Sequence, residues 1–311
     1  MRFRAFCSIA VMIVAGATGH AALADHRYVA RDGVDGSGCG ASTAPCKSLA
    51  LAISEAAAGD KIICRDAGGS GPLIINKGLE IDCSSARQLV GGNTSTGGSP
   101  FSAIIIDTSA SAVKTVRIRG LGVGGTSVSF GLPAVGIYIK SATAVFLEDV
   151  VVSDTAQIGV QDVRTGGQTK LFITDSIIRN IGGVGVGIGL GAQGPNTNVL
   201  DNVRSEFNGY GIAAATGNNV QINRSVFSGN STAGIEGDPG AQIAVDNSVI
   251  SHNDTGVQSN SSVRLFNNHI SFNSIAITGA SASLGQNRFS GNSALGTAPT
   301  PIAGASANIG P

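Results

Sequence analysis

Four acidic side chains lie close together near the middle of the sequence, in a spacing that could serve acid–base chemistry. They are Glu148, Asp149, Asp154 and Asp175. Two carboxylates held near each other repel unless a metal ion, a base or backbone hydrogen bonds offset their charge. Three basic side chains of the same region could add positive charge: Lys170, Arg179 and Arg204. These cations, or a bound Ca²⁺, could acidify the proton beside a uronate carboxylate so that a base removes it, which is lyase chemistry.

The candidate catalytic residues are Glu148, Asp149 and Asp175. A structural role explains the same acids more simply, because aspartate commonly accepts hydrogen bonds from backbone N–H groups at turns. We favour this structural role, and catalysis by the three acids is the alternative hypothesis.

A second acidic group could serve hydrolysis. Asp201, Asn223 and Asp246 recur at equivalent places in a repeat described below. Two carboxylates two repeats apart would be separated by about 9 to 10 Å, near the upper end of the separation in inverting glycosidases. Because Asp and Asn both suit turns, we again favour a structural role.

The histidines do not indicate a metal site. His252 beside Asp254, and His269, are expected at surface corners of the fold. A zinc site would need further ligands in register, and no second histidine supplies them. The sequence therefore predicts no bound metal, except for Ca²⁺ under the lyase alternative.

Polar side chains around one tyrosine suggest binding rather than catalysis. The segments 161–169 and 189–198 are longer than their counterparts elsewhere, which predicts loops that project from one edge. A shallow polar surface with one aromatic ring suits sugar hydroxyls. The candidate binding residues are Tyr138, Lys140, Gln161, Arg164, Glu236 and Gln258.

A short motif recurs along the chain and predicts the elements that position these residues. It consists of a polar pair, an apolar pair, an asparagine, and a small residue followed by a β-branched one, as in 223–235, 246–257 and 266–277. Aligning these motifs gives a period of about 20 to 30 residues, which is typical of a solenoid. The aligned positions are Asp154, Asn180, Asn208, Asn230, Asn253, Asn273 and Asn292.

Each repeat contains three short apolar segments that alternate in and out, such as Val220 with Ile222. None is long enough for a helix, so each repeat is expected to be one coil of three strands. Coils stack about 4.8 Å apart, which would let equivalent asparagine amides hydrogen-bond along the stack. Asparagine also tolerates the left-handed backbone of a sharp corner. We therefore interpret the asparagines as structural.

The repeats from about Val145 to Asn292 resemble those of right-handed parallel β-helix proteins, the pectate-lyase-like superfamily. The segment 28–64 resembles the beginning of such helices, with a strand, a Gly/Asp loop, a capping helix and "GDKI" leading into the first coil. The helix is expected over about 45–58, with Leu49, Ile53 and Ala56 on one side and Gly59 as its stop. The resemblance implies an all-β, right-handed parallel β-helix domain over 25–292, followed by an irregular cap or tail over 293–311.

The motifs of the enzymes with this architecture are missing. The polygalacturonase-like series NTD, DD, GHG and RIK is absent, as are the DPHE string of alginate epimerases, the DFIFG string of pectin methylesterases and the WIDH-type segment of pectate lyases. The resemblance therefore implies the fold and no single activity.

The first 24 residues have the features of a signal peptide. A basic start, "MRFR", precedes an apolar run too short to span a membrane, and Ala22-Leu23-Ala24 forms a small-x-small cleavage site. We expect a secreted or periplasmic protein without a transmembrane segment. Removal of Arg2 and Arg4 leaves 18 of the 20 basic side chains against 20 acidic ones. That balance argues against nucleic acid as a partner, since phosphate binding needs a dense field of lysine and arginine.

Four cysteines would remain after Cys7 leaves with the signal peptide, and an even number in an exported chain predicts two disulfides. They are Cys39, Cys46, Cys64 and Cys83. Three pairings are possible, and we favour Cys39 with Cys46 across the loop before the helix, and Cys64 with Cys83. No two cysteines have the spacing of a CxxC redox or zinc motif.

The sequence thus predicts an exported, non-catalytic β-helix that contacts polysaccharide or another surface in the cell envelope or outside the cell. The alternative is a polysaccharide lyase or glycoside hydrolase that acts on uronate-rich polysaccharide. The ligand and the oligomeric state stay open.

Overall fold

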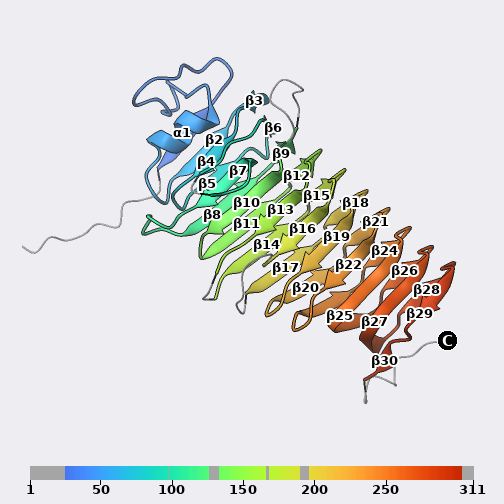
Figure 1. Cartoon of the computed structure of the whole chain (residues 1–311). Helices are drawn as coiled ribbons and strands as arrows, with labels where there is room; N and C mark the ends of the chain where they lie inside the picture. Colours follow the sequence, from blue (N-terminus) through green and yellow to red (C-terminus); the bar gives the residue numbers. More distant parts are fainter. Residues whose placement is uncertain (1–24, 97, 126–132, 166–167, 190–195, 303–311) are drawn as a thin grey trace, which may run out of the picture.

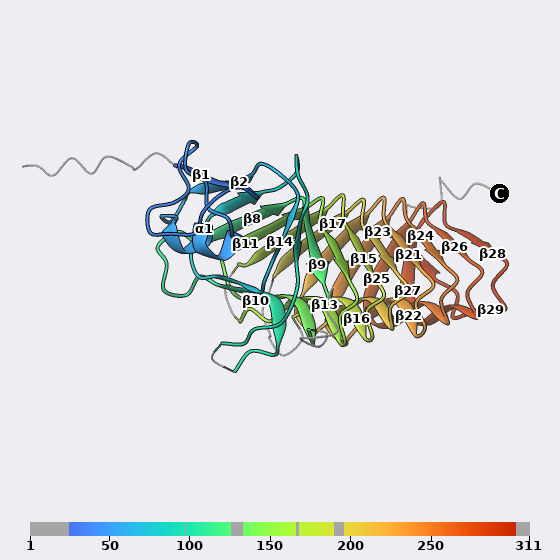
Figure 2. The same ribbon diagram turned by 90° about the horizontal axis from the view of Figure 1, so that it is seen from above.

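Stacked coils of short parallel strands make up most of the molecule (Figure 1). The computed structural model describes residues 25–96, 98–125, 133–165, 168–189 and 196–302. The predicted signal peptide, most of the 189–198 loop and the end of the predicted tail lie outside these residues. The regular stack is also seen from above in Figure 2. Each coil contributes strands to three surfaces, which we call face 1, face 2 and face 3.

Face 1 begins with β4 and includes the first half of two long strands, β25 and β27. Its strands pair in parallel from coil to coil. They are β4 (Leu73–Ile75), β7 (Ser102–Asp107), β10 (Val135–Ser141), β13 (Ile158–Asp162), β16 (Val184–Ile188), β19 (Tyr210–Ala214), β22 (Ala233–Gly237), β25 (Thr255–Phe266), β27 (Ile275–Gly285) and β29 (Ala294–Gly296).

Face 2 follows face 1 along each coil. It also receives the second halves of β25 and β27, which continue around the corner without a break. Its other strands are β1 (His26–Val29), β2 (Lys61–Cys64), β5 (Glu80–Asp82), β8 (Thr115–Arg119), β11 (Ala144–Glu148), β14 (Lys170–Thr174), β17 (Thr197–Asp201), β20 (Asn219–Asn223), β23 (Gln242–Asp246) and β30 (Thr300–Pro301).

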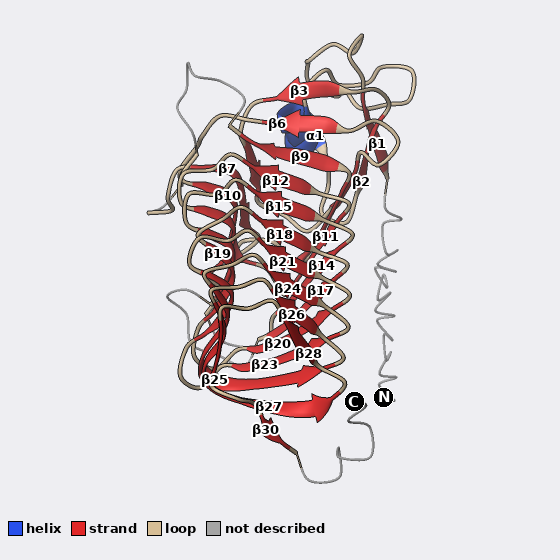
Figure 3. Cartoon of the chain, turned by 90° about the vertical axis from the view of Figure 1, so that its right-hand side faces the viewer, coloured by secondary structure: helices blue, strands red, loops and turns tan. Residues whose placement is uncertain are grey.

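Face 3 is a separate ten-stranded sheet of the described residues, and its strands succeed one another down the stack in Figure 3. Most have only three residues. They are β3 (Gly68–Ser70), β6 (Gln88–Val90), β9 (Leu121–Gly124), β12 (Val151–Ser153), β15 (Ile177–Arg179), β18 (Arg204–Glu206), β21 (Val226–Ser228), β24 (Val249–Ser251), β26 (His269–Ser271) and β28 (Arg288–Ser290).

Aliphatic side chains fill the interior in columns, where a column is the set of residues at one position of successive coils. One column of face 1 is wholly buried and runs through Ile104, Ile137, Val160, Val186, Ile212, Ile235, Val257 and Ile277. The alternation of the sequence thus places every second residue inside, as expected for strands.

Most coils turn two sharp corners, each on a single residue with left-handed backbone, beginning at Gly120 for corner 1 and at Asp154 for corner 2. Corner 1 follows face 2 and holds Gly120, Asp149, Asp175, Asn202, Arg224, Asn247, Asn267 and Gln286. Corner 2 follows face 3 and holds Asp154, Asn180, Phe207, Gly229, His252, Phe272 and Gly291. All have φ between 49° and 68°. Because this conformation costs a residue with a β-carbon about 1–2 kcal/mol, Gly, Asn and Asp suit it best.

The predicted asparagine ladder exists, with a shift in two coils. Asn230 is buried and donates from Nδ2 to Asn253 Oδ1 at 2.9 Å, and the contact repeats down the stack. The amides therefore bond along the stack as predicted. However, the left-handed residue is the one before each asparagine. Asp154 and Asn180 occupy that preceding position, so their alignment was wrong by one residue. The inward side chain must satisfy buried backbone groups, whereas the residue before it makes the reversal and points outward.

A short helix, α1 (Leu49–Glu55), packs at the N-terminal end of the stack (Figure 1). Ser48 caps it by accepting a hydrogen bond from Leu51 N at 3.3 Å. The predicted inward residues Leu49, Ile53 and Ala56 are buried. The helix is shorter than the predicted 45–58, because Cys46 is tied to β1 and the chain leaves the helix at Ala56.

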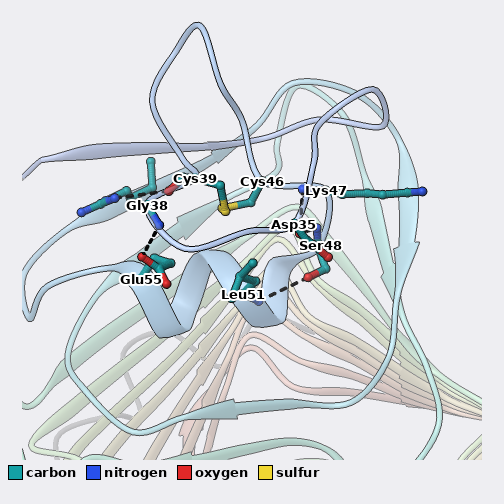
Figure 4. The surroundings of a disulfide bond; sticks show 9 residues. Asp35, Gly38, Cys39, Cys46, Lys47, Ser48, Leu51 and Glu55 are labelled. Carbon is teal, nitrogen blue, oxygen red and sulfur yellow. Dashed lines mark hydrogen bonds between the residues drawn. A yellow bond between two sulfur atoms is a disulfide. The ribbon is translucent and has the colours of Figure 1, made fainter.

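Both favoured disulfides are confirmed. Cys39 bonds Cys46 in the loop before α1, where Asp35 accepts hydrogen bonds from the backbone of Lys47 and Ser48 (Figure 4). Cys64 bonds Cys83 between the first two coils. Such links in the first coils oppose fraying of the end of the solenoid.

The stack continues past the predicted boundary at Asn292. Ala294 and Gly296 of β29 pair with Ile275 and Ile277, and β30 pairs with β27. This pairing uses backbone hydrogen bonds without an alternating apolar sequence, which explains why the segment resembled an irregular cap. No helix within the described residues is long and apolar enough to cross a membrane.

Candidate functional site

The predicted binding residues of the strands form one outward column of face 1. Tyr138 is next to Gln161, and Glu236 is next to Gln258. Gly187 and a further small residue, Ala213, separate the two pairs. The outward direction is therefore as predicted, but the polar side chains form two pairs rather than one continuous trough.

A polar hollow of about 440 Å³ lies at the corner between face 1 and face 2, at the end of the Tyr138 strand. Its floor is the short turn at Ala142 and Thr143, and it is also lined by described residues of two longer connections, 108–114 and 163–169, from the coils on either side. Because the turn is short and its neighbours are longer, the described residues leave an open space above the turn. The polar side chains that line the hollow include Lys114, Lys140, Ser109, Thr143, Thr165 and Gln168.

The hollow carries more positive than negative charge. Lys140 Nζ lies 3.0 Å from Asp107 Oδ2. Burial raises the pKa of Asp107, but hydrogen bonds from Ser109 and Lys140 outweigh burial and hold the pKa below its usual value. Lys114 is exposed and forms no ion pair with any residue that the structure describes. Two ammonium groups therefore face one carboxylate, which favours an anionic ligand.

Arg164 differs from its predicted role as a surface binding residue. Its side chain is only 2% exposed, and its guanidinium bonds the fully buried carboxylate of Asp162. Nη1 donates to the carbonyl oxygens of Ala142 and Lys170 at 3.1 and 3.2 Å. Arg164 is drawn inward because Asp162, at an otherwise apolar inward position, needs a partner. It therefore holds the floor of the hollow rather than offering its charge to solvent.

The three candidate catalytic acids do not meet at one point, and each has a protein partner. Asp149 and Asp175 are neighbours at corner 1, as their spacing predicted. Arg87 binds Asp149 at 2.6 Å, and Asn202 donates to Asp175 at 2.7 Å.

Glu148 points outward from face 2, where Arg117 and Arg119 both bind its carboxylate. The neighbour of Glu148 in its column is Thr174, so the structure does not bring Glu148 and Asp175 to one point. Of the basic residues expected to assist, Arg204 instead pairs with Glu206 at 2.6 Å.

The carboxylates that would bind Ca²⁺ under the lyase hypothesis already have protein partners. Calcium takes six to eight oxygen ligands, whereas here cationic or amide groups already occupy the carboxylates of Asp149 and Asp175. Among the described residues, no group of three or more His, Cys, Asp or Glu side chains is placed to hold a metal ion.

Asp201, Asn223 and Asp246 stand in one outward column of face 2, as their spacing predicted. Asn223 donates to Asp201 Oδ1 at 3.2 Å, and Arg224 also binds Asp201. Burial raises the pKa of Asp246. The amide between the two carboxylates and the arginine on the first suit a structural column more than a hydrolytic pair.

Glu236 has an unusual carboxyl group. Burial, together with the charge of Asp238 and a hydrogen bond with it, raises the pKa of Glu236 to about 7. The sequence pattern that could have indicated this pair is E-x-D at the end of a strand, since residues two apart share a face. The same reasoning missed Lys114 and Asp107, because loop length rather than strand alternation brings them to the hollow.

Comparison with known proteins agrees with this geometry. Residues 163–307 match the family model described as "Right handed beta helix region". The pectate lyase Pel9A superposes with a TM-score of 0.62 over 90% of this chain and 78% of its own. The fold is a right-handed parallel β-helix.

The β-helix is only 15% identical to Pel9A. Tailspike protein 2 of Escherichia coli O157:H7 bacteriophage CAB120 is 12% identical and superposes with a TM-score of 0.53 over 77% of this chain and 38% of its own. No curated protein matches the chain in sequence. At these identities the likeness concerns the fold, so the function must be argued from the site.

Proposed function

We propose that the β-helix is an exported, non-catalytic protein that binds acidic polysaccharide in the hollow between face 1 and face 2. The observation that carries this proposal is the convergence of Lys114 and Lys140 on one polar space with a single counter-charge, Asp107. The volume of about 440 Å³ lies within the range of about 300–1,000 Å³ typical of ligand pockets. Tyr138 and Gln161, on the adjoining strands, would extend the contact along face 1.

The chemistry of the hollow suits a sugar acid. The lysines offer charge to a carboxylate, and the hydroxyl and amide groups of Ser109, Thr143 and Gln168 offer hydrogen bonds to sugar hydroxyls. The pectate lyase Pel9A shares the fold, which supports a polysaccharide as the ligand class. The two disulfides support an oxidising compartment, as expected of an exported protein.

The partners of the acidic residues support binding without catalysis. A carboxylate that removes a proton must be free to accept it. Glu148 instead faces two guanidinium groups, and Asp149 faces a third. Each ion pair occupies carboxylate oxygens that would otherwise be available to a substrate.

Affinity electrophoresis in gels that contain polygalacturonate or alginate tests the proposal. The wild type should be retarded, and K114Q together with K140Q should bind about tenfold more weakly or worse, since each lost ion pair at a desolvated site weakens binding. K47Q, which removes an exposed lysine near α1, is the matched control and should bind normally. If the wild type is retarded neither by polygalacturonate nor by alginate, the acidic ligand is refuted. An increase in the absorbance of unsaturated product during incubation with either polymer would refute the non-catalytic role.

A further inference from the structure

Two exposed aromatic rings occupy corner 2, at positions where the backbone disfavours them. Phe207 and Phe272 have φ of 56° and 55°, and their side chains are 64% and 57% exposed. Most other coils place Asp, Asn or Gly there, residues that tolerate left-handed backbone. An exposed phenylalanine adds little to the core, so burial does not offset the strain. Strain at an exposed aromatic residue, without burial to offset it, supports a role other than stability.

The two rings form a strip together with His252. The His252 ring stacks on Phe272, with ring centroids 5.3 Å apart. Pairing of β18, β21, β24 and β26 places Phe207, Gly229, His252 and Phe272 on successive coils. At about 4.8 Å per coil, the strip is about 14 Å long and runs parallel to the axis of the solenoid. It follows the edge of face 3 where β18, β24 and β26 end (Figure 3).

Glycines in the neighbouring coils make room for the rings. A β-carbon on Gly229 would lie 2.8 Å from the Phe207 ring, and one on Gly291 would lie 2.5 Å from the Phe272 ring. Each phenylalanine therefore leans over the glycine of the next coil. This arrangement keeps the rings along the edge while more than half of each side chain stays exposed.

Serines lie beside the strip, together with two exposed charged side chains, Arg179 of the coil before Phe207 and Asp254 after His252. The residue before each position is a serine in four successive coils: Ser228, Ser251, Ser271 and Ser290. Ser251 and Ser271 are buried, so Ser228 and Ser290 present the accessible hydroxyl groups. The nearest charged side chains of β18, Arg204 and Glu206, bind each other at 2.6 Å. Aromatic faces beside hydroxyl groups match a ligand that has apolar C–H faces and neutral hydroxyl edges.

We propose that the strip of Phe207, His252 and Phe272 is a second saccharide-binding surface, which stacks on the pyranose rings of a neutral polysaccharide chain. The electron-rich face of an aromatic ring attracts the polarised C–H groups of a sugar ring. The strip is one side chain wide, whereas a stable protein interface buries about 800 Å² per partner. Its shape thus fits a polymer chain that lies along the edge and does not fit a second copy of the protein.

The double variant F207N with F272N tests the strip. Asparagine suits left-handed backbone, so this variant should melt at the same temperature as the wild type or higher. F101N is the matched control, because Phe101 is 60% exposed and directly precedes β7, away from corner 2. The assay is affinity electrophoresis in gels that contain hydroxyethylcellulose, xylan or glucomannan, with polygalacturonate in a parallel gel.

The wild type and F101N should be retarded in at least one neutral gel, and the double variant should bind that polymer about tenfold more weakly or worse. Equal retardation of the double variant, or no retardation of the wild type in any neutral gel, would overturn the proposal. The proposal would also be overturned if the wild type sediments as a dimer and the double variant sediments as a monomer. The variant K114Q with K140Q should still bind the neutral polymer. The proposal for the strip and the proposal for the lysine hollow can therefore be refuted separately.

Discussion

The guanidinium of Arg164 and the carboxylate of Asp162 form a buried pair, with Nη2 and Oδ2 2.5 Å apart and both side chains almost fully enclosed. Arg164 also donates to Ala142 O at 3.1 Å and so joins the short turn to the coil that follows it. The floor of the hollow therefore depends on a charge pair inside the solenoid.

Breaking this pair should be costly. D162A leaves the Arg164 charge buried without its partner, and we expect the free energy of unfolding to fall by about 3–5 kcal/mol. Urea denaturation followed by circular dichroism measures the change. The double variant D162L with R164M removes both charges and should recover most of the loss. If D162A alone is as stable as the wild type, Arg164 is not held by Asp162.

The inward columns make a second prediction. V245D places an unpaired charge at a fully buried position and should destabilise the protein by several kcal/mol. The matched control is A244D, since Ala244 is the preceding residue and points outward on face 2. Thermal melting of both variants compares the two sites. Equal melting temperatures would contradict the register of β23.

The raised pKa of Glu236 predicts a pH dependence. The folded protein binds the Glu236 proton more tightly than the unfolded chain, because the pKa rises from 4.5 to about 7. This contribution to stability is therefore fully present below about pH 4.5 and is lost as the pH rises through about 7. E236Q should remove this part of the decline in melting temperature between pH 5 and 8. D238N removes the neighbouring charge and should weaken the same decline. If the melting temperatures of the wild type and of E236Q change by the same amount between pH 5 and pH 8, the assignment of the raised pKa to Glu236 is contradicted.

Calcium separates the structural role of the acids at corner 1 from their possible catalytic role. Because Arg87 and Asn202 already bind Asp149 and Asp175, we expect added CaCl₂ to leave the melting temperature unchanged. A ligand that binds only the folded state would raise it by mass action. D149N with D175N is the control. A calcium-dependent rise that this double variant abolishes would establish a shared ion and restore the lyase hypothesis.

The strands and the solenoid could be predicted because their signals repeat locally, and the disulfides because an even number of cysteines remains near the start of an exported chain. Alternation along a strand decides which side chain points outward, and this placed Tyr138, Gln161, Glu236 and Gln258 in one column. The register between coils was wrong at two positions. Asp154 and Asn180 lie one residue before the ladder position, since the first coils use other residues where later coils use asparagine.

By itself, the sequence determined the architecture, since each coil must bury the same apolar positions and turn the same corners. Only the tertiary structure decided which side chains meet across coils. Lys114 and Lys140 share a hollow because two long loops flank one short turn, and Arg164 lies inside because Asp162 does. Phe207 and Phe272 form an edge with His252 because corner 2 repeats in register. Lys114 and Lys140, like His252 and Phe272, are 20 or more positions apart, and their geometry depends on the register between coils and on loop lengths, which no local pattern encodes. Asp162 and Arg164 are only two positions apart, but the coils around them decide that both side chains are buried.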